Sequence, residues 1–139
     1  PNRVEKRWWL ADEAVQTLNR QDVALVPVYN RSHDEVVRYM CAADALLLTS
    51  YSEGSPNVIK EAMACNCPIV STDVGDVRWV TEGVDGTYVS SRDEAPSLRD
   101  CLRKALDFNG RTKGRVAIEE KGLSAKSVAK KIISLYNNI

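Results

Sequence analysis

Residues 45–75 read ALLLTSYSEGSPNVIKEAMACNCPIVSTDVG. Two short apolar runs, 45–48 and 68–71, enclose a loop rich in Gly, Ser and Pro and then a stretch of helical character over 57–65. Continuous apolar runs of this length are typical of strands that are covered on both faces. A strand, a helix and a second strand in this order predict a right-handed βαβ unit with parallel strands.

The same alternation extends in both directions along the chain. Upstream, the pattern predicts helices at 6–19 and 34–43 with a strand at 24–28 between them, and Ser32 caps the second helix. Downstream, it predicts a short helix at 77–81, a strand at 86–89 and amphipathic helices at 94–108, 112–121 and 124–136. This order indicates an α/β fold, a Rossmann-like parallel sheet with helices on both faces, in a single domain over 1–139. Such a sheet normally begins with a strand, whereas this chain begins with a charged segment, so we expect the first strand to be missing, as in a fragment of a larger protein.

Composition limits the class of protein. Of 139 residues, 44% are apolar and 27% charged, which is enough apolar material for a core and excludes a disordered chain. Nineteen basic residues balance nineteen acidic ones, so the composition carries neither a nucleic-acid footprint nor a polybasic membrane anchor. No apolar run approaches the roughly 20 residues of a membrane span, and no signal segment opens the chain. We therefore expect a cytoplasmic domain without a membrane span.

The cysteines and acids do not predict a metal site. Cys65 and Cys67 are separated by one residue only, and the single histidine lies more than thirty residues upstream, which does not fit zinc-ligand spacing. We expect all four cysteines to be free and mostly buried thiols. Asp73 and Asp76 are two acids without a third ligand, so no metal cofactor is predicted.

The loop after the run 45–48 carries the best ligand-binding pattern, because open α/β sheets bind ligands at the carboxyl ends of their strands. Gly54 permits a tight turn, Ser55 is predicted to cap the next helix, and Pro56 suits the first helical position. The amides of Asn57 and Val58 then lack partners within the helix. Free amides and the positive end of the helix dipole predict a phosphate site there.

Glu53 and Glu61 flank that predicted phosphate site. Carboxylates only accept hydrogen bonds, so a pair of them beside a phosphate suits a ligand with hydroxyl groups on either side, such as a nucleoside diphosphate sugar. Each glutamate taken alone also has a purely structural interpretation. Glu53 would be a solvated loop residue, and Glu61 would be a surface helix residue paired with Arg or Lys. In the next loop, Gly75 either lets the backbone approach the same ligand or forms a simple turn.

Four stretches, 42–50, 53–57, 61–65 and 68–75, resemble the C-terminal, nucleotide-sugar-binding domain of the retaining, family-four (group 1) glycosyltransferases of GT-B fold. The match includes that family's motif of two glutamates separated by seven residues. The resemblance implies that Glu53 binds hydroxyls of the transferred sugar, that Glu61 binds the ribose, and that the following amides contact the sugar and the distal phosphate. It further implies that Arg3 and Lys6 neutralise the departing diphosphate, so that Glu53, Arg3 and Lys6 are the catalytic candidates.

The resemblance also sets expectations for the whole protein. It implies a hexosyltransferase-type enzyme in which the departing diphosphate itself can take the proton of the acceptor, with no cofactor or metal besides the nucleotide-sugar donor. The chain would be the donor-binding half of a two-domain enzyme, with the acceptor held by an absent N-terminal domain, and isolated it would bind donor without turnover. Family members often serve polysaccharide biosynthesis. His33 either contacts the nucleotide or simply begins the helix 34–43.

Two other functions remain open at this point. A nucleotide-sugar epimerase would also place carboxylates near a sugar diphosphate, although its proton transfers need further acids and histidines, and this chain has one histidine. A non-enzymatic phosphate-binding module of Rossmann-like type would need only the loop and helix start. A phosphorylatable receiver would need a strand that ends in an acidic cluster, which the sequence lacks.

Overall fold

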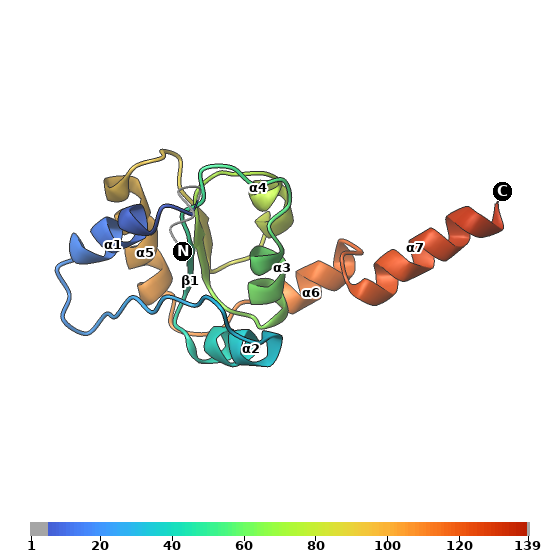
Figure 1. Cartoon of the computed structure of the whole chain (residues 1–139), viewed down its shortest axis with the longest axis horizontal. Coiled ribbons are helices and arrows are strands. Elements are labelled where there is room, and N and C mark those ends of the chain that lie inside the picture. The colour runs from blue at the N-terminus through green and yellow to red at the C-terminus, as the bar shows by residue number, and fades with distance from the viewer. Residues whose placement is uncertain (1–5, 139) are drawn as a thin grey trace.

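The computed structural model describes residues 6–138 and is drawn in Figure 1. Its strands are β1 (Leu46–Leu48), β2 (Ile69–Ser71) and β3 (Thr87–Val89). Its helices are α1 (Trp8–Gln16), α2 (His33–Ala42), α3 (Asn57–Ala64), α4 (Val77–Thr81), α5 (Ala95–Asp107), α6 (Gly114–Glu120) and α7 (Ala125–Asn137). Each helix predicted from the sequence is present, with bounds shifted by at most three residues.

The three strands form one parallel sheet in the order β1-β2-β3. Leu47 pairs with Val70, and Val70 pairs with Tyr88. The helix α3 connects the first two strands and α4 connects the last two. The βαβ units that the alternation predicted are therefore confirmed for this sheet.

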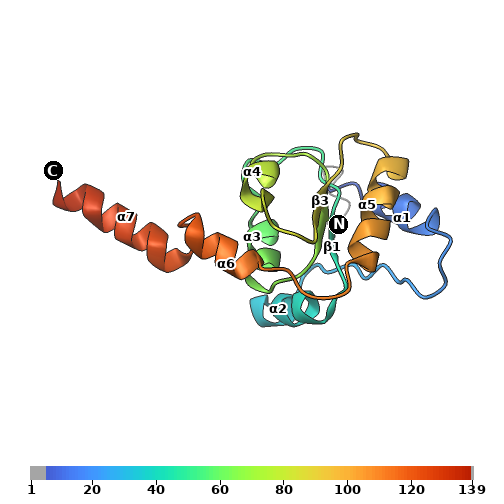
Figure 2. The ribbon, with the colours of Figure 1, turned by 180° about the vertical axis from the view of Figure 1, so that it is seen from behind.

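Helices cover both faces of the sheet, as predicted (Figures 1 and 2). On one face, Leu10 of α1 and Leu98 of α5 pack with Val70. On the other, Ile59 of α3 and Val77 of α4 pack with Ile69. All six of these side chains are at most 2% exposed, and full burial of such a side chain is worth roughly 1.5–3 kcal/mol. The alternation of inward-facing residues along β2 thus fixes which helix lies on which face.

Polar contacts terminate the helices next to the sheet. Ser32 and Glu35 form the capping box that begins α2, which confirms the predicted cap. Asn66 adopts a left-handed φ of 55° after α3. The guanidinium of Arg111 donates to the carbonyls of Met40 and Ala43 at 2.7 Å and of Cys65 at 3.1 Å, so one cation satisfies the C-terminal carbonyls of α2 and α3.

The strand predicted at 24–28 is wrong. This segment is irregular and pairs with no strand among residues 6–138. Val26, Val28 and Tyr29 are 56%, 40% and 60% exposed, so the apolar run is not covered on either face. Pro27 lacks an N–H for a ladder, and a run of five apolar residues does not by itself distinguish a strand from an extended loop. The strand expected before Pro1 lies outside the described residues.

The cysteines are free, as predicted, but only Cys67 is buried. Cys41 lies exposed near the end of α2, and Cys65 and Cys101 are half-buried. The expectation of mostly buried thiols was therefore wrong, because the ends of α2 and α3 lie closer to the surface than their apolar composition suggested.

The C-terminal helix α7 extends away from the sheet (Figures 1 and 2). None of its residues is buried, and Ile133, Leu135 and Tyr136 are 58%, 68% and 75% exposed. Across residues 6–138, no helix combines the length and apolar content that a bilayer crossing requires.

Candidate functional site

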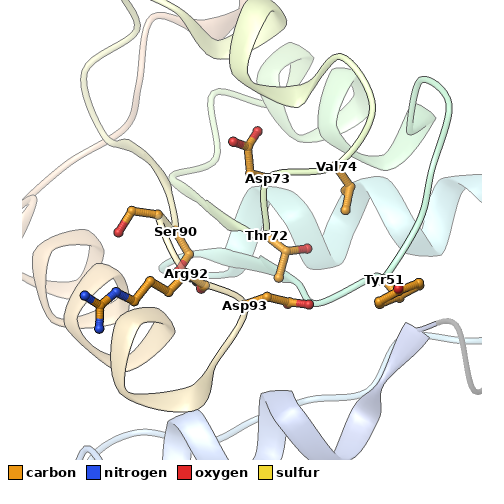
Figure 3. Close-up of a pocket in the computed structure, with 8 residues that line it drawn as sticks. Tyr51, Thr72, Asp73, Val74, Ser90, Arg92 and Asp93 are labelled. Carbon is orange, nitrogen blue, oxygen red and sulfur yellow. Dashed lines mark hydrogen bonds between the residues drawn. The ribbon is translucent and has the colours of Figure 1, made fainter.

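The loops that follow the three strands meet at the carboxyl edge of the sheet. The Thr72 amide donates to the Leu48 carbonyl at 3.0 Å, and the Ser90 amide donates to the Ser71 carbonyl at 2.8 Å, so the ladder continues into these loops. A cavity of about 150 Å³ opens among them, lined by Tyr51, Thr72, Asp73, Val74, Ser90, Ser91, Arg92 and Asp93. Figure 3 shows Thr72 and Asp93 between the loops, whereas Arg92 extends away from Tyr51. Neither Glu53 nor Glu61 lines this cavity.

The side chain of Glu53 is held by two donors from different parts of the chain. Its Oε1 accepts from Lys6 Nζ and, at 2.8 Å, from Ser50 Oγ. The side chain of Glu53 is 21% exposed and that of Lys6 is 48% exposed, so both remain reachable from solvent. The hydrogen bond from Lys6 lowers the pKa of the Glu53 carboxyl, assisted by Ser50 and opposed by burial. Glu53 is consequently an ionised acceptor at neutral pH.

The amino end of α3 begins directly after that loop. Pro56 is the N-cap residue, with φ −68° and ψ 115°, and Asn57 is the first helical residue. Ile59 donates its amide to the Pro56 carbonyl at 3.2 Å, whereas within residues 6–138 the Asn57 and Val58 amides find no acceptor outside the helix. Asn57 is exposed and Val58 is half-buried. The predicted pair of unbonded amides is therefore present at the start of α3.

Two details of the predicted helix start are corrected. Ser55 does not cap α3, because its hydroxyl donates to Asp76 Oδ2 at 2.5 Å and accepts from Lys60 Nζ at 2.5 Å. Pro56 precedes the first helical residue instead of occupying it. Pro56 has no N–H in either position, so the first free amides still belong to Asn57 and Val58.

The second glutamate lies further along α3. Asn57 and Glu61 are separated by roughly 6 Å along the helix axis. The side chain of Glu61 is 36% exposed, and its Oε1 lies 3.9 Å from Nδ1 of His33, which is 72% exposed. His33 is the first residue of α2, and its side chain also lies beside Glu61, the predicted ribose acceptor.

Gly75 holds the second loop against the first. Its φ is +55°, and a Cβ at this position would clash with the Gly54 carbonyl oxygen and lie 2.8 Å from that of Glu53. The Asp76 amide donates to the Gly54 carbonyl at 3.1 Å. Gly75 therefore forms a left-handed turn that packs on Gly54.

The remaining predicted residues are placed as follows. Arg3 lies outside the described residues. Asp73 accepts from Arg78 Nε at 3.0 Å and from Arg78 Nη2 at 2.8 Å, while Asp76 binds Ser55. In the part of the chain that the structure describes, no three His, Cys, Asp or Glu side chains gather as metal ligands would.

Sequence reasoning missed Arg7 and Asp93. Arg7 is 9% exposed and forms a bidentate pair with Asp93, at 2.7 Å and 2.5 Å. Its Nε also donates to the Thr49 carbonyl at 2.8 Å. The two partners are 86 residues apart in sequence, and no local pattern marks either one. Only the packing of α1 and α5 on one face of the sheet brings them together.

Comparisons with a family model and with curated proteins all match glycosyltransferases. The family model described as "Glycosyl transferases group 1" matches residues 5–107. A "Putative teichuronic acid biosynthesis glycosyltransferase TuaC" from Bacillus subtilis is 51% identical over 43 residues, covering 31% of this chain and 11% of that protein. A "D-inositol 3-phosphate glycosyltransferase" from Mycobacterium marinum is 34% identical over 93 residues, covering 64% of this chain and 20% of that protein.

Among solved structures, a sucrose-phosphate synthase from Thermosynechococcus elongatus superposes with a TM-score of 0.70 and 21% sequence identity. The superposition covers 92% of this chain and 33% of that one, and at this identity it supports the fold alone. The chain thus spans only a minor part of each of these proteins, between 11% and 33% of their lengths.

Proposed function

The chain belongs to the group 1 glycosyl transferases, and on that premise we propose that it binds a nucleoside diphosphate sugar as the donor for retaining glycosyl transfer. It is the donor-binding domain of a two-domain enzyme, and a separate N-terminal domain holds the acceptor. The match to only 11% and 20% of two glycosyltransferase relatives supports this division.

One observation carries the proposal: unbonded amides at the start of α3 lie between two partly exposed carboxylates. Asn57 and Val58 present their N–H groups where the helix dipole is positive, which suits a diphosphate. Glu53 precedes these amides, and Glu61 follows them by roughly 6 Å along the axis. Sugar hydroxyls donate to Glu53 and ribose hydroxyls donate to Glu61, so a linear ligand of sugar, diphosphate and ribose matches the order of the groups.

The chemistry follows from where charge develops. When the sugar leaves, negative charge grows on the diphosphate, and the α3 amides together with the Lys6 ammonium stabilise it. Arg3 adds a second positive charge in this proposal. Glu53 positions the sugar and is not the nucleophile, because the proposed transfer needs positive charge at the departing diphosphate and no covalent intermediate with the protein. The departing diphosphate takes the proton of the acceptor on the same face, which retains the anomeric configuration, and no metal is required.

The wider setting is proposed from the family. The name of the Bacillus subtilis relative refers to teichuronic acid biosynthesis, and we infer that the complete protein acts in polysaccharide biosynthesis in the cytoplasm. In this proposal the 139 residues alone bind donor weakly and do not turn it over, because the acceptor is held by a separate domain.

Titration of the ¹⁵N-labelled chain with UDP, GDP, ADP and the corresponding nucleotide sugars tests the proposal. The Asn57, Val58 and Glu61 amide signals are expected to shift with at least one nucleotide. Glu61→Gln should weaken nucleotide binding roughly tenfold, because a hydrogen bond to a charged acceptor is worth about 1.5–3 kcal/mol. Glu53→Gln should remove the additional affinity for the nucleotide sugar without lowering the affinity for the nucleotide, because the change also releases Lys6 from its ion pair.

Glu120→Gln is the matched control, because Glu120 is exposed at the end of α6. It should change neither affinity. If no nucleotide shifts the α3 amides, or if Glu120→Gln weakens binding as much as Glu61→Gln, the proposed donor site is wrong.

A further inference from the structure

Arg7 adopts a backbone conformation that is uncommon for a residue with a side chain. Its φ and ψ are 44° and 55°, in the left-handed region, at the N-cap of α1. Such a conformation carries a strain of the order of 1 kcal/mol and persists where surrounding contacts enforce it. The side chain is buried, at 9% exposure for the residue as a whole, so a charged group is held inside the protein next to a strained backbone.

The guanidinium of Arg7 joins three segments. Its Nε donates to the Thr49 carbonyl at 2.8 Å, and one Nη donates to the Ser50 carbonyl at 3.1 Å. The same group pairs with both oxygens of Asp93, in the loop between β3 and α5. In return, the Thr49 hydroxyl donates to the Lys6 carbonyl at 2.8 Å. The end of β1, the start of α1 and the β3–α5 loop are therefore locked together.

Both donors to Glu53 belong to this cluster. Lys6 immediately precedes Arg7, and its backbone is held by the Thr49 hydroxyl. Ser50 has its carbonyl bound by Arg7 while its hydroxyl donates to Glu53. We propose that Arg7 is a positioning residue that aims Lys6 and Ser50 at the Glu53 carboxylate, and so pre-organises the sugar-binding acceptor without touching the ligand.

Only a guanidinium can perform this role. The acceptors of Arg7 are two carbonyls and a bidentate carboxylate, which together match the planar fork of an arginine. A lysine ammonium keeps the charge but is a single point and cannot reach all of these oxygens. Arg7→Lys therefore removes the geometry while it preserves the charge near Glu53.

The first test compares Arg7→Lys with Arg111→Lys in the 139-residue chain. Arg111 is a matched control, because it also donates to three carbonyls but binds the ends of α2 and α3 instead of the Glu53 loop. The pKa of the Glu53 carboxyl is followed by ¹³C NMR during an acid titration. In Arg7→Lys this pKa should rise toward its ordinary value, because Lys6 and Ser50 lose the part of their support that Arg7 provides, although the Thr72 hydroxyl still donates to the Ser50 carbonyl at 2.7 Å. In Arg111→Lys the chain loses stability but the pKa of Glu53 stays unchanged.

A second variant keeps the test decisive if Arg7→Lys does not fold. Asp93→Asn alters a half-exposed carboxylate and disrupts the bidentate pair that directs the Arg7 guanidinium toward the Thr49 and Ser50 carbonyls. Loss of a nearby negative charge would by itself lower the pKa of Glu53, so a rise in this variant reports displaced donors. An unchanged or lower pKa of Glu53 in the variant that folds overturns the proposal.

The consequence for ligand binding rests on the proposed function. Arg7→Lys should weaken nucleotide-sugar binding roughly threefold to tenfold while nucleotide alone binds as before. If the pKa of Glu53 rises but no nucleotide sugar binds any variant, the proposed function fails and the positioning role stands. If the unaltered chain binds nucleotide sugar and Arg7→Lys changes neither the pKa nor the affinity, the positioning role fails and the proposed function stands.

Discussion

Gly75→Ala should destabilise the protein by more than the backbone strain of an alanine in the left-handed conformation. Gly75 has φ +55°, and an alanine there carries a conformational cost of about 1–2 kcal/mol. The added Cβ would also clash with the carbonyl of Gly54 and lie 2.7 Å from its carbonyl carbon. Moving that loop away weakens the 3.1 Å hydrogen bond from the Asp76 amide, worth about 1 kcal/mol. We expect a total loss of roughly 2–4 kcal/mol.

Gly83→Ala separates the two contributions. Gly83 also has positive φ, +75°, but a Cβ there meets nothing within 4 Å. It should cost only the conformational strain, about 1–2 kcal/mol. The effect of glycine on the unfolded chain is common to both variants and cancels in the comparison.

Urea unfolding followed by circular dichroism at 222 nm measures both free energies. Tryptophan fluorescence is a poor probe here, because Trp8, Trp9 and Trp79 are 46%, 60% and 52% exposed in the folded chain. If Gly75→Ala and Gly83→Ala lower the free energy of unfolding equally, the packing of the two loops contributes nothing and the argument from Gly54 is refuted. Should the difference hold, Gly75→Ala should also shift the amide signals of Gly54 and Glu53.

Three further predictions concern pH, capping and thiol chemistry. Lys6 lowers the pKa of Glu53 in the folded chain, so the stability that Glu53 contributes is complete above its unfolded pKa and is lost as pH falls through the lower folded value. In Glu53→Gln the urea midpoint should therefore fall less steeply with pH below about pH 5. Ser32→Ala removes the capping box of α2 and should cost about 1 kcal/mol by urea unfolding, whereas Ser52→Ala, in an exposed loop, should cost much less. Iodoacetamide at neutral pH should label exposed Cys41 and leave Cys67 unmodified until the chain unfolds, because Cys67 is 0% exposed and burial raises the pKa of its thiol. Equal labelling of the two cysteines, measured by mass spectrometry, would contradict the structure.

The elements that sequence predicted well are those with a local signal. The run 45–48, the loop with Gly54 and Pro56, and the periodic pattern of α3 are contiguous, and their structure depends mostly on neighbours in the chain. The same is true of the cap at Ser32. Local chemistry was therefore sufficient for the βαβ core and for the unbonded amides at its carboxyl edge.

The segment 24–28 shows the opposite case. Its composition is that of a strand, but a strand also needs a partner ladder and covering helices, and neither is encoded within five residues. Val26 and Val28 face solvent as a result. The prediction failed because strand pairing and covering by helices are tertiary interactions, which the hydrophobic pattern of a short segment does not report.

In the candidate site, too, residues within one stretch of sequence were predicted well, and contacts between distant segments were not. Glu53, Asn57, Val58 and Glu61 lie in one stretch of sequence, and their relation to one another followed from the helix start. The pairing of Lys6 with Glu53 spans 47 residues, and only the family resemblance indicated that Lys6 belonged near the site. Nothing local predicted that Ser55 would bind Asp76 instead of capping α3, because that contact depends on the turn at Gly75.

If the proposed function holds, these contacts also determine the order in which the groups of the site engage the donor. In the unliganded chain Lys6 is already paired with Glu53, so its positive charge is largely offset before a diphosphate arrives. The amides of Asn57 and Val58 carry no such offset, and they are therefore the first part of the site that attracts an anion. Once sugar hydroxyls donate to Glu53, the carboxylate no longer depends on Lys6, and the ammonium can turn toward the phosphates. On the proposed function, a nucleotide sugar should therefore release Lys6 toward the diphosphate where a nucleotide alone leaves it bound to Glu53, and recognition of the sugar would be coupled to stabilisation of the leaving group.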